Sequence, residues 1–95
     1  MTESDRLNQQ LHEGARLLQS EGASEVYVFG SAAHGRIHPS SDVDLAVSGL
    51  PPEKFFGMLS RLSAIFLRQV DLIDLDDENL FTRYLRRKGL LRRVV

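Results

Sequence analysis

The sequence predicts an α/β domain in which helices pack on a small mixed β-sheet. Two long segments, about 4–20 and from 51 onward, carry apolar residues at helical spacing. Short runs rich in β-branched residues follow each of these segments, as is typical of buried strands. The resulting order of helix, strand, loop, strand, helix, strand and helix indicates a layer of helices on a sheet.

The first half of the chain predicts one helix and two strands. We expect the helix over about 4–20, with Ser4 as its N-cap. Residues 26–29 are β-branched and aromatic and predict a short buried strand, and 31–41 have the composition of a loop. Residues 42–47 alternate polar and apolar at their start and predict the second strand.

The second half predicts helix, strand and helix. Pro51 and Pro52 suit the first turn of a helix, and residues 70–75 predict the third strand. The acidic run 76–78 fits the positive N-terminal end of a last helix, and the basic run 86–88 fits its negative end. Gly89 is the expected stop.

Composition and charge limit the class of protein. The 95 residues are 42% hydrophobic and 26% charged, with a net charge of -1, which is ordinary for a soluble globular domain. The absence of cysteine excludes disulfides and thiolate zinc sites. The polar, acidic start is unlike a signal peptide, and no apolar run is long enough to span a bilayer. We expect a complete, cytoplasmic protein with a single domain over residues 1–95.

The charge is unevenly distributed. Residues 83–95 hold six of the twelve basic residues and no acidic one, whereas all thirteen acidic residues precede them. Such a basic tail can bind nucleic acid, an acidic protein or the acidic part of its own domain. The favoured interpretation is a solvated helix end that balances its own domain. Nucleic-acid binding is disfavoured because the tail lacks an aromatic stacking platform and the net charge of the chain is -1.

Polar residues at the strand ends are candidates for a site. Asp42 and Asp44 are two residues apart on an expected strand, so their carboxylates leave the same face. Two such carboxylates suit a hard cation such as Mg²⁺, although a solvated pair is the simpler interpretation of the two alone. Gly30 and Ser31 close a buried strand, where a small residue lets phosphate oxygens approach backbone N–H groups. Asp71 lies in an otherwise apolar strand and needs a cation, a donor or solvent.

Together these residues form a recognisable pattern. Gly30-Ser31, ten intervening residues and then Asp42-Val43-Asp44 resemble the signature of the DNA polymerase β-like nucleotidyltransferase superfamily. The wider segments 30–36 (Gly-Ser-Ala-Ala-His-Gly-Arg) and 41–47 (Ser-Asp-Val-Asp-Leu-Ala-Val) resemble the minimal nucleotidyltransferases of bacteria and archaea. The resemblance covers nearly the whole chain and implies a nucleotidyltransferase fold like the polymerase β palm.

The resemblance also implies a reaction and a role for each residue. Gly30 and Ser31 would bind the β- and γ-phosphates of ATP. Asp42 and Asp44 would ligate Mg²⁺, and Asp71 would complete the metal site and help deprotonate the attacking hydroxyl. This is metal-assisted transfer of AMP from ATP, with pyrophosphate leaving.

Two alternatives stay open within the pattern. Many relatives carry arginine where this chain has His34, so a phosphate contact is either missing or moved to Arg36. Asp74 competes with Asp71 for the place of the third carboxylate, and the two point to opposite faces of one strand. The position of Asp71 straight after Val70 in the matching motif favours Asp71.

The acceptor is suggested by what the chain has no room for. Larger relatives carry a second domain that holds the acceptor, whereas minimal members resemble one half of a pair with a small helical HEPN ribonuclease. The resemblance therefore implies an antitoxin-type protein adenylyltransferase that modifies a tyrosine of a HEPN partner, as part of a homo- or hetero-oligomer. The alternative is a non-catalytic antitoxin or scaffold that binds a helical partner directly. Direct nucleic-acid binding is the least favoured function.

Overall fold

Three helices and a four-stranded sheet make up the fold in the computed structural model, which describes residues 2–35, 38 and 41–95. The α-helices and β-strands occur in the order α1 (Glu3–Ser20), β1 (Glu25–Phe29), β2 (Val43–Ser48), α2 (Phe55–Phe66), β3 (Val70–Asp74), α3 (Leu80–Arg87) and β4 (Arg92–Arg93). Two short 3₁₀ helices, η1 (Gly30–His34) and η2 (Pro52–Lys54), follow β1 and precede α2. No helix among these described residues is both long and apolar enough to span a membrane.

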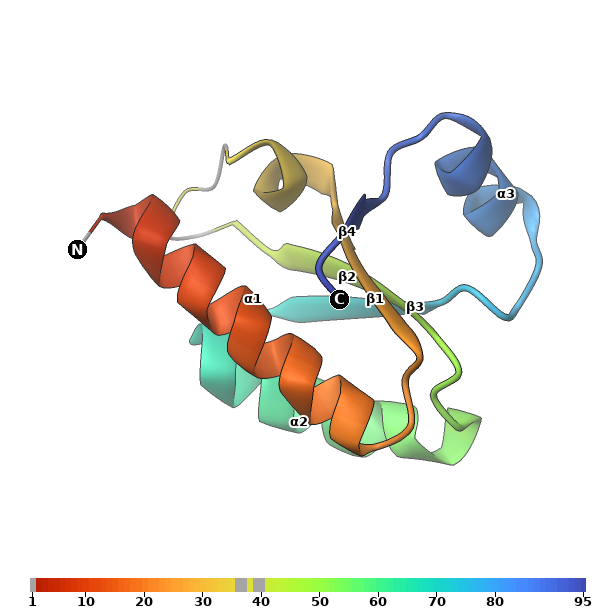
Figure 1. Ribbon diagram of the computed structural model, residues 1–95, viewed down its shortest axis with the longest axis horizontal. Helices are drawn as coiled ribbons and strands as arrows, with labels where there is room; N and C mark the ends of the chain where they lie inside the picture. The colour runs from red at the N-terminus through yellow and green to blue at the C-terminus, as the bar shows by residue number, and fades with distance from the viewer. Residues whose placement is uncertain (1, 36–37, 39–40) are drawn as a thin grey trace.

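The sheet is mixed, as the sequence predicts. Its strand order is β3-β2-β1-β4, with β1 antiparallel to both β2 and β4 and with β2 parallel to β3. Figure 1 shows α1 and α2 lying along one side of the sheet, with α3 set apart at the other end of the view. The predicted fold class, helices packed on a small mixed sheet, is therefore confirmed.

The two faces of the sheet are covered unequally. One face packs under α1 and α2 in the larger core, which includes Val28 and Leu45 of the strands. The other face carries only a small core, in which Leu85 of α3 packs with strand and turn residues. The buried members of this smaller core are Phe29, Ala46, Leu75 and Leu85. The sparse cover leaves much of this second face accessible.

Capping moves two helix starts away from their expected positions. Thr2, rather than Ser4, caps α1: its hydroxyl accepts from the Asp5 N–H at 3.1 Å and its own N–H donates to the Asp5 carboxylate at 3.3 Å. This reciprocal pair satisfies two otherwise free groups, so the helix begins at Glu3, before the expected cap. Asn79 and Thr82 form the same arrangement at the start of α3.

The acidic run 76–78 consequently lies before α3 and not in its first turn. The Asp76 carboxylate instead accepts from the Ser48 hydroxyl at 2.6 Å and from the Gly49 N–H at 2.7 Å. The hydrogen bond from Ser48, followed by that from Gly49, lowers the pKa of Asp76. Asp76 therefore ties the end of β3 to the end of β2, and the expectation that this run begins the helix is wrong.

The basic tail contributes a strand that the sequence does not predict. After Gly89, at φ 63°, the chain returns along the sheet, where Arg92 pairs with Val28 and Arg93 with Tyr27. The Arg93 guanidinium lies 5.9 Å from the centre of the Tyr27 ring. The tail is therefore an edge strand as well as the end of a helix.

Candidate functional site

Two of the expected site carboxylates lie side by side at one end of the sheet. Asp44 of β2 and Asp71 of β3 are direct partners in the parallel pairing. Paired residues of neighbouring strands project from the same face, so the two carboxylates share one face. Phe29 of β1 is the antiparallel partner of Asp44 and belongs to the smaller core, which identifies this face as the one turned away from α1 and α2.

Asp42, the remaining carboxylate expected in the site, lies next to this pair. Asp42 directly precedes β2 and is exposed, and its charge acts on Asp44. Asp44 itself is partly buried, whereas Asp71 is exposed. Asp42 therefore lies close enough to the pair for its charge to act on Asp44, at an edge of the sheet where exposed Asp42 and Asp71 are open to water and ligands.

The environment of Asp44 opposes its ionisation. Burial is the largest cause that raises the pKa of the Asp44 carboxyl above its usual range. Three further effects raise that pKa: the charge of Asp71, a hydrogen bond that protonated Asp44 donates to Asp71, and the charge of Asp42. A carboxylate held under such repulsion is suited to a cation, which would favour the ionised form.

The raised pKa predicts that Asp44→Asn stabilises the ligand-free protein at neutral pH. When the pKa of a carboxyl group is higher in the folded than in the unfolded chain, the free energy of unfolding of the protein decreases as the pH rises through the folded pKa. We expect the free energy of unfolding at pH 7 to rise by up to about 1 kcal/mol, a value kept low because Asp44 is partly solvated. Denaturant titrations at pH 7 and below about pH 3.9, where the difference should vanish, measure it.

Asp76→Asn is the control of opposite sign. The pKa of Asp76 is lowered in the folded protein, so its ionisation stabilises the fold at pH 7 and is lost as the pH falls. This variant should be less stable than the wild type at neutral pH. A loss of stability in Asp44→Asn at pH 7 would contradict the prediction.

The turn after β1 brings glycine against the carboxylates. Gly30 has φ 69°, a backbone conformation that favours glycine, and a Cβ placed on it would collide with Oδ2 of Asp44. Ser31 follows in η1 and is exposed, so its hydroxyl is accessible next to the same edge. The expected loop 31–41 is therefore helical in its first part.

The other candidates are placed differently. His34 is exposed at the end of η1. Arg36 lies outside the described residues. Asp74 pairs with Val47 rather than with Asp44, and its Oδ1 accepts from the N–H of Asp76 at 2.9 Å. The register therefore brings Asp71 to Asp44 and leaves Asp74 at the far end of β3.

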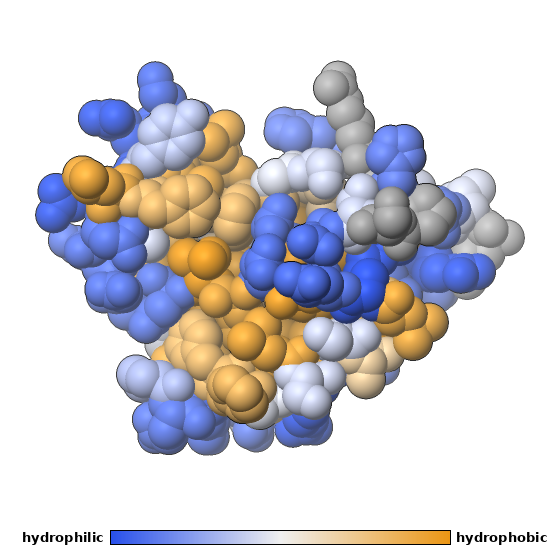
Figure 2. Space-filling view, turned by 180° about the vertical axis from the view of Figure 1, so that it is seen from behind, coloured by the Kyte–Doolittle hydropathy of each residue, from blue (hydrophilic) through white to orange (hydrophobic). Residues whose placement is uncertain are grey.

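An exposed apolar surface on α3 was not anticipated from the sequence. Phe81 is 47% exposed, although its ring meets that of Phe29 edge to face with centroids 6.0 Å apart. Leu80 and Tyr84 are also exposed on this helix, at 84% and 45%. In Figure 2 apolar atoms gather over α3 on the left and continue toward the middle of the molecule. The signal available in the sequence was apolar residues on more than one side of a short helix.

Comparison with known proteins gives a family and a fold. Residues 15–91 match the family model described as polymerase beta, nucleotidyltransferase. Among solved structures, a protein described as a minimal nucleotidyltransferase is 22% identical, with a TM-score of 0.76 over 90% of this chain and 92% of that chain. A chain of a toxin–antitoxin complex with AMP-PNP is 20% identical, with a TM-score of 0.71 over 99% of this chain and 73% of that one.

A third similar structure holds a modified toxin. It is a tri-AMPylated Shewanella oneidensis HEPN toxin in complex with an MNT antitoxin, and the matching chain is 18% identical, with a TM-score of 0.70. The match covers 94% of this chain and 71% of that chain. No match was found among the curated proteins. At these identities the structural likeness establishes the fold.

Proposed function

Because the chain belongs to the polymerase β nucleotidyltransferase family, we propose that it transfers AMP from ATP to an acceptor with the help of Mg²⁺. The observation that carries the proposal is the in-register pairing of Asp44 with Asp71 on two parallel strands. Asp42 adds a third carboxylate next to this pair. Carboxylates held together against their own repulsion are a common means of binding a cation at an active site.

The residues present fit Mg²⁺. Their oxygens are the hard ligands that this ion prefers, and the repulsion that raises the pKa of Asp44 would be relieved by a cation. Among the described residues no three His, Asp or Glu side chains form a ready-made metal cage. Mg²⁺ does not require one, because it is usually bound by one or two carboxylates together with water and substrate phosphates. We assign Asp42, Asp44 and Asp71 to this ion, which when bound would offset negative charge on the phosphate oxygens.

Gly30 and Ser31 are proposed to hold the β- and γ-phosphates. The first N–H groups of a short helix have no partner within it and can donate to an anion. The missing side chain of Gly30 lets the Asp44 carboxylate approach the backbone of this turn, at a place that a Cβ would occupy. We propose Arg36 as a further phosphate contact, since its guanidinium can donate two hydrogen bonds to one phosphate.

The chain's residues would then direct a single displacement. The acceptor hydroxyl oxygen attacks the α-phosphorus of ATP, the bond from that phosphorus to the oxygen bridging to the β-phosphate breaks, and pyrophosphate leaves. Asp71 is exposed and beside Asp44, so it can accept the proton that the hydroxyl loses. The product is AMP joined to the acceptor through a phosphoester bond.

We propose that the acceptor is a tyrosine of a HEPN-type partner protein. This is supported by the structural neighbours, which include an AMPylated HEPN toxin with an MNT antitoxin. It is also supported by the apolar surface of α3, which includes Phe81 packed on Phe29, the direct neighbour of Asp44 in the sheet. Exposed apolar side chains grouped on one element are typical of a protein interface. A partner docked there would lie next to the carboxylates.

Calorimetric titration of ATP tests the proposal. We expect saturable binding that requires MgCl₂ and that is lost in Asp42→Ala/Asp44→Ala, because the variant lacks two of the three proposed metal ligands. Glu53→Ala/Glu78→Ala removes the same charge from exposed positions outside the site and should bind as the wild type does. A wild-type chain that binds no Mg²⁺–ATP, alone or with its HEPN partner, would rule the proposal out.

The exposed surface of α3 also favours a second candidate, a non-catalytic antitoxin that acts by binding alone. The two functions differ in what Asp42→Ala/Asp44→Ala does to neutralisation of the partner. Transfer of AMP depends on these carboxylates, whereas docking through α3 does not. Neutralisation of the partner's ribonuclease by the double variant at wild-type strength would favour the second candidate.

A further inference from the structure

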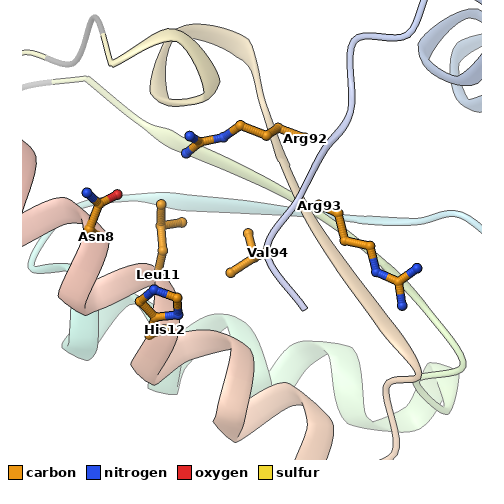
Figure 3. Close-up of a pocket in the computed structure, with 6 residues that line it drawn as sticks. All are labelled: Asn8, Leu11, His12, Arg92, Arg93 and Val94. Carbon is orange, nitrogen blue, oxygen red and sulfur yellow. The ribbon is translucent and has the colours of Figure 1, made fainter.

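A polar hollow lies between α1 and β4, away from the carboxylates (Figure 3). Its volume is about 140 Å³. The residues that line it are Asn8, Leu11, His12, Arg92, Arg93 and Val94. It therefore joins the middle of the first helix to the basic tail, two segments at opposite ends of the sequence.

The sheet separates this hollow from the proposed active site. Arg92 is the strand partner of Val28, whose side chain is buried in the core beneath α1 and α2. Paired residues share a face, so Arg92 projects on the α1 side. Asp44 shares the other face with Phe29. A ligand in the hollow would thus be bound independently of Mg²⁺ and of the carboxylates.

The lining supplies hydrogen-bond donors and no acid. Figure 3 shows the Arg92 side chain reaching over Leu11 toward Asn8, with His12 on the next turn of α1, whereas Arg93 points away. Within the described part of the chain, no ion pair or hydrogen bond is recorded for the side chains of Asn8, His12 or Arg92. Guanidinium, amide and imidazole groups are therefore available together at one small opening.

We propose that this hollow binds a phosphate group, either as a free phosphoanion or as the terminal phosphate of a nucleotide. A planar guanidinium donates two parallel hydrogen bonds to a tetrahedral oxyanion, and donors from a second element can reach its other oxygens. Arg92 supplies the guanidinium. Asn8 and His12, both on α1, supply the additional donors. The small volume accommodates one such group and leaves the remainder of a larger ligand outside.

Amide NMR titration of the wild-type chain with inorganic phosphate tests the proposal at roughly 0.15 M salt, where weak surface attraction is screened. We expect saturable shifts at Asn8, His12 and Arg92, without MgCl₂ and unchanged in Asp42→Ala/Asp44→Ala. Arg92→Gln should weaken binding about tenfold, since it removes a charged hydrogen-bond donor. A parallel titration with AMP identifies the source: tighter binding of AMP indicates a nucleotide, and equal binding indicates the free anion.

Two further variants separate the site from general surface charge. Asn8→Ala/His12→Ala replaces exposed helix residues with the best helix former, so the fold should persist while phosphate binding falls. Arg83→Gln/Arg87→Gln removes two exposed arginines of α3 and should leave phosphate binding unchanged. Shifts that do not saturate, that spread evenly over the basic residues, or that survive both Arg92→Gln and Asn8→Ala/His12→Ala would overturn the proposal.

Discussion

Asp71→Asn is expected to reduce transfer of AMP by about a thousandfold, whereas Asp74→Asn should leave it within a few fold of wild type. Asparagine has nearly the shape of aspartate but neither its charge nor its ability to take a proton. Asp71 lies beside Asp44 across the parallel strands, so its loss removes both a proposed metal ligand and the proposed base. Asp74 pairs with Val47 further along the same strand and lies away from this pair.

Incorporation of α-labelled AMP into the HEPN-type partner measures both variants. Asp74→Asn is a matched control, because it makes the same chemical change three residues away on the same strand. Its side-chain oxygen can still accept the N–H of Asp76, so the turn after β3 should be retained. Loss of transfer in Asp74→Asn with transfer intact in Asp71→Asn would reverse the assignment of the third carboxylate.

The sequence predicts the elements of the fold better than their limits. Apolar spacing locates α1 and α2, because residues such as Leu18 and Leu62 must all face one core. The starts of α1 and α3 depend instead on Thr2 and Asn79, whose capping competes with nearby serine and acidic side chains. Several residues near each start have the right chemistry, and only the folded backbone selects among them.

β4 could not be predicted for a different reason. Two arginines carry no β-propensity or alternation, and the strand exists because the free edge of β1 offers backbone partners to the returning chain. The same tertiary event forms the hollow between α1 and Arg92. The basic tail, which the sequence predicts to be a solvated helix end, is therefore held against β1 as an edge strand.

The candidate site depends both on local sequence spacing and on how the strands align in the folded sheet. The spacing of Asp42 and Asp44 is local, so the sequence can place them on one face of a strand. The sequence motif favours Asp71 over Asp74, but the contact between Asp71 and Asp44 depends on how β3 aligns with β2. The raised pKa of Asp44 follows from that alignment and from burial, and both are properties of the assembled sheet.

Gly30→Ala is expected to abolish Mg²⁺–ATP binding and to lower the free energy of unfolding by about 1–3 kcal/mol. Two effects combine at this position. The φ of 69° disfavours any residue with a Cβ, and that Cβ would collide with the carboxylate of Asp44. Gly89→Ala is the matched control, since Gly89 has φ 63° and open space around it. Gly89→Ala should lower the free energy of unfolding through the backbone conformation alone, and it should leave ATP binding intact.

A double-variant cycle separates the collision from the backbone cost. In an Asp44→Ala background the carboxylate that Gly30→Ala would meet is gone, so the loss of stability should fall to the value measured for Gly89→Ala. Thermal and denaturant unfolding of the four proteins in the cycle gives this coupling directly. If Gly30→Ala costs the same with and without Asp44, the glycine serves only the turn after β1, and the close approach of that turn to the carboxylate does not explain why glycine occupies position 30.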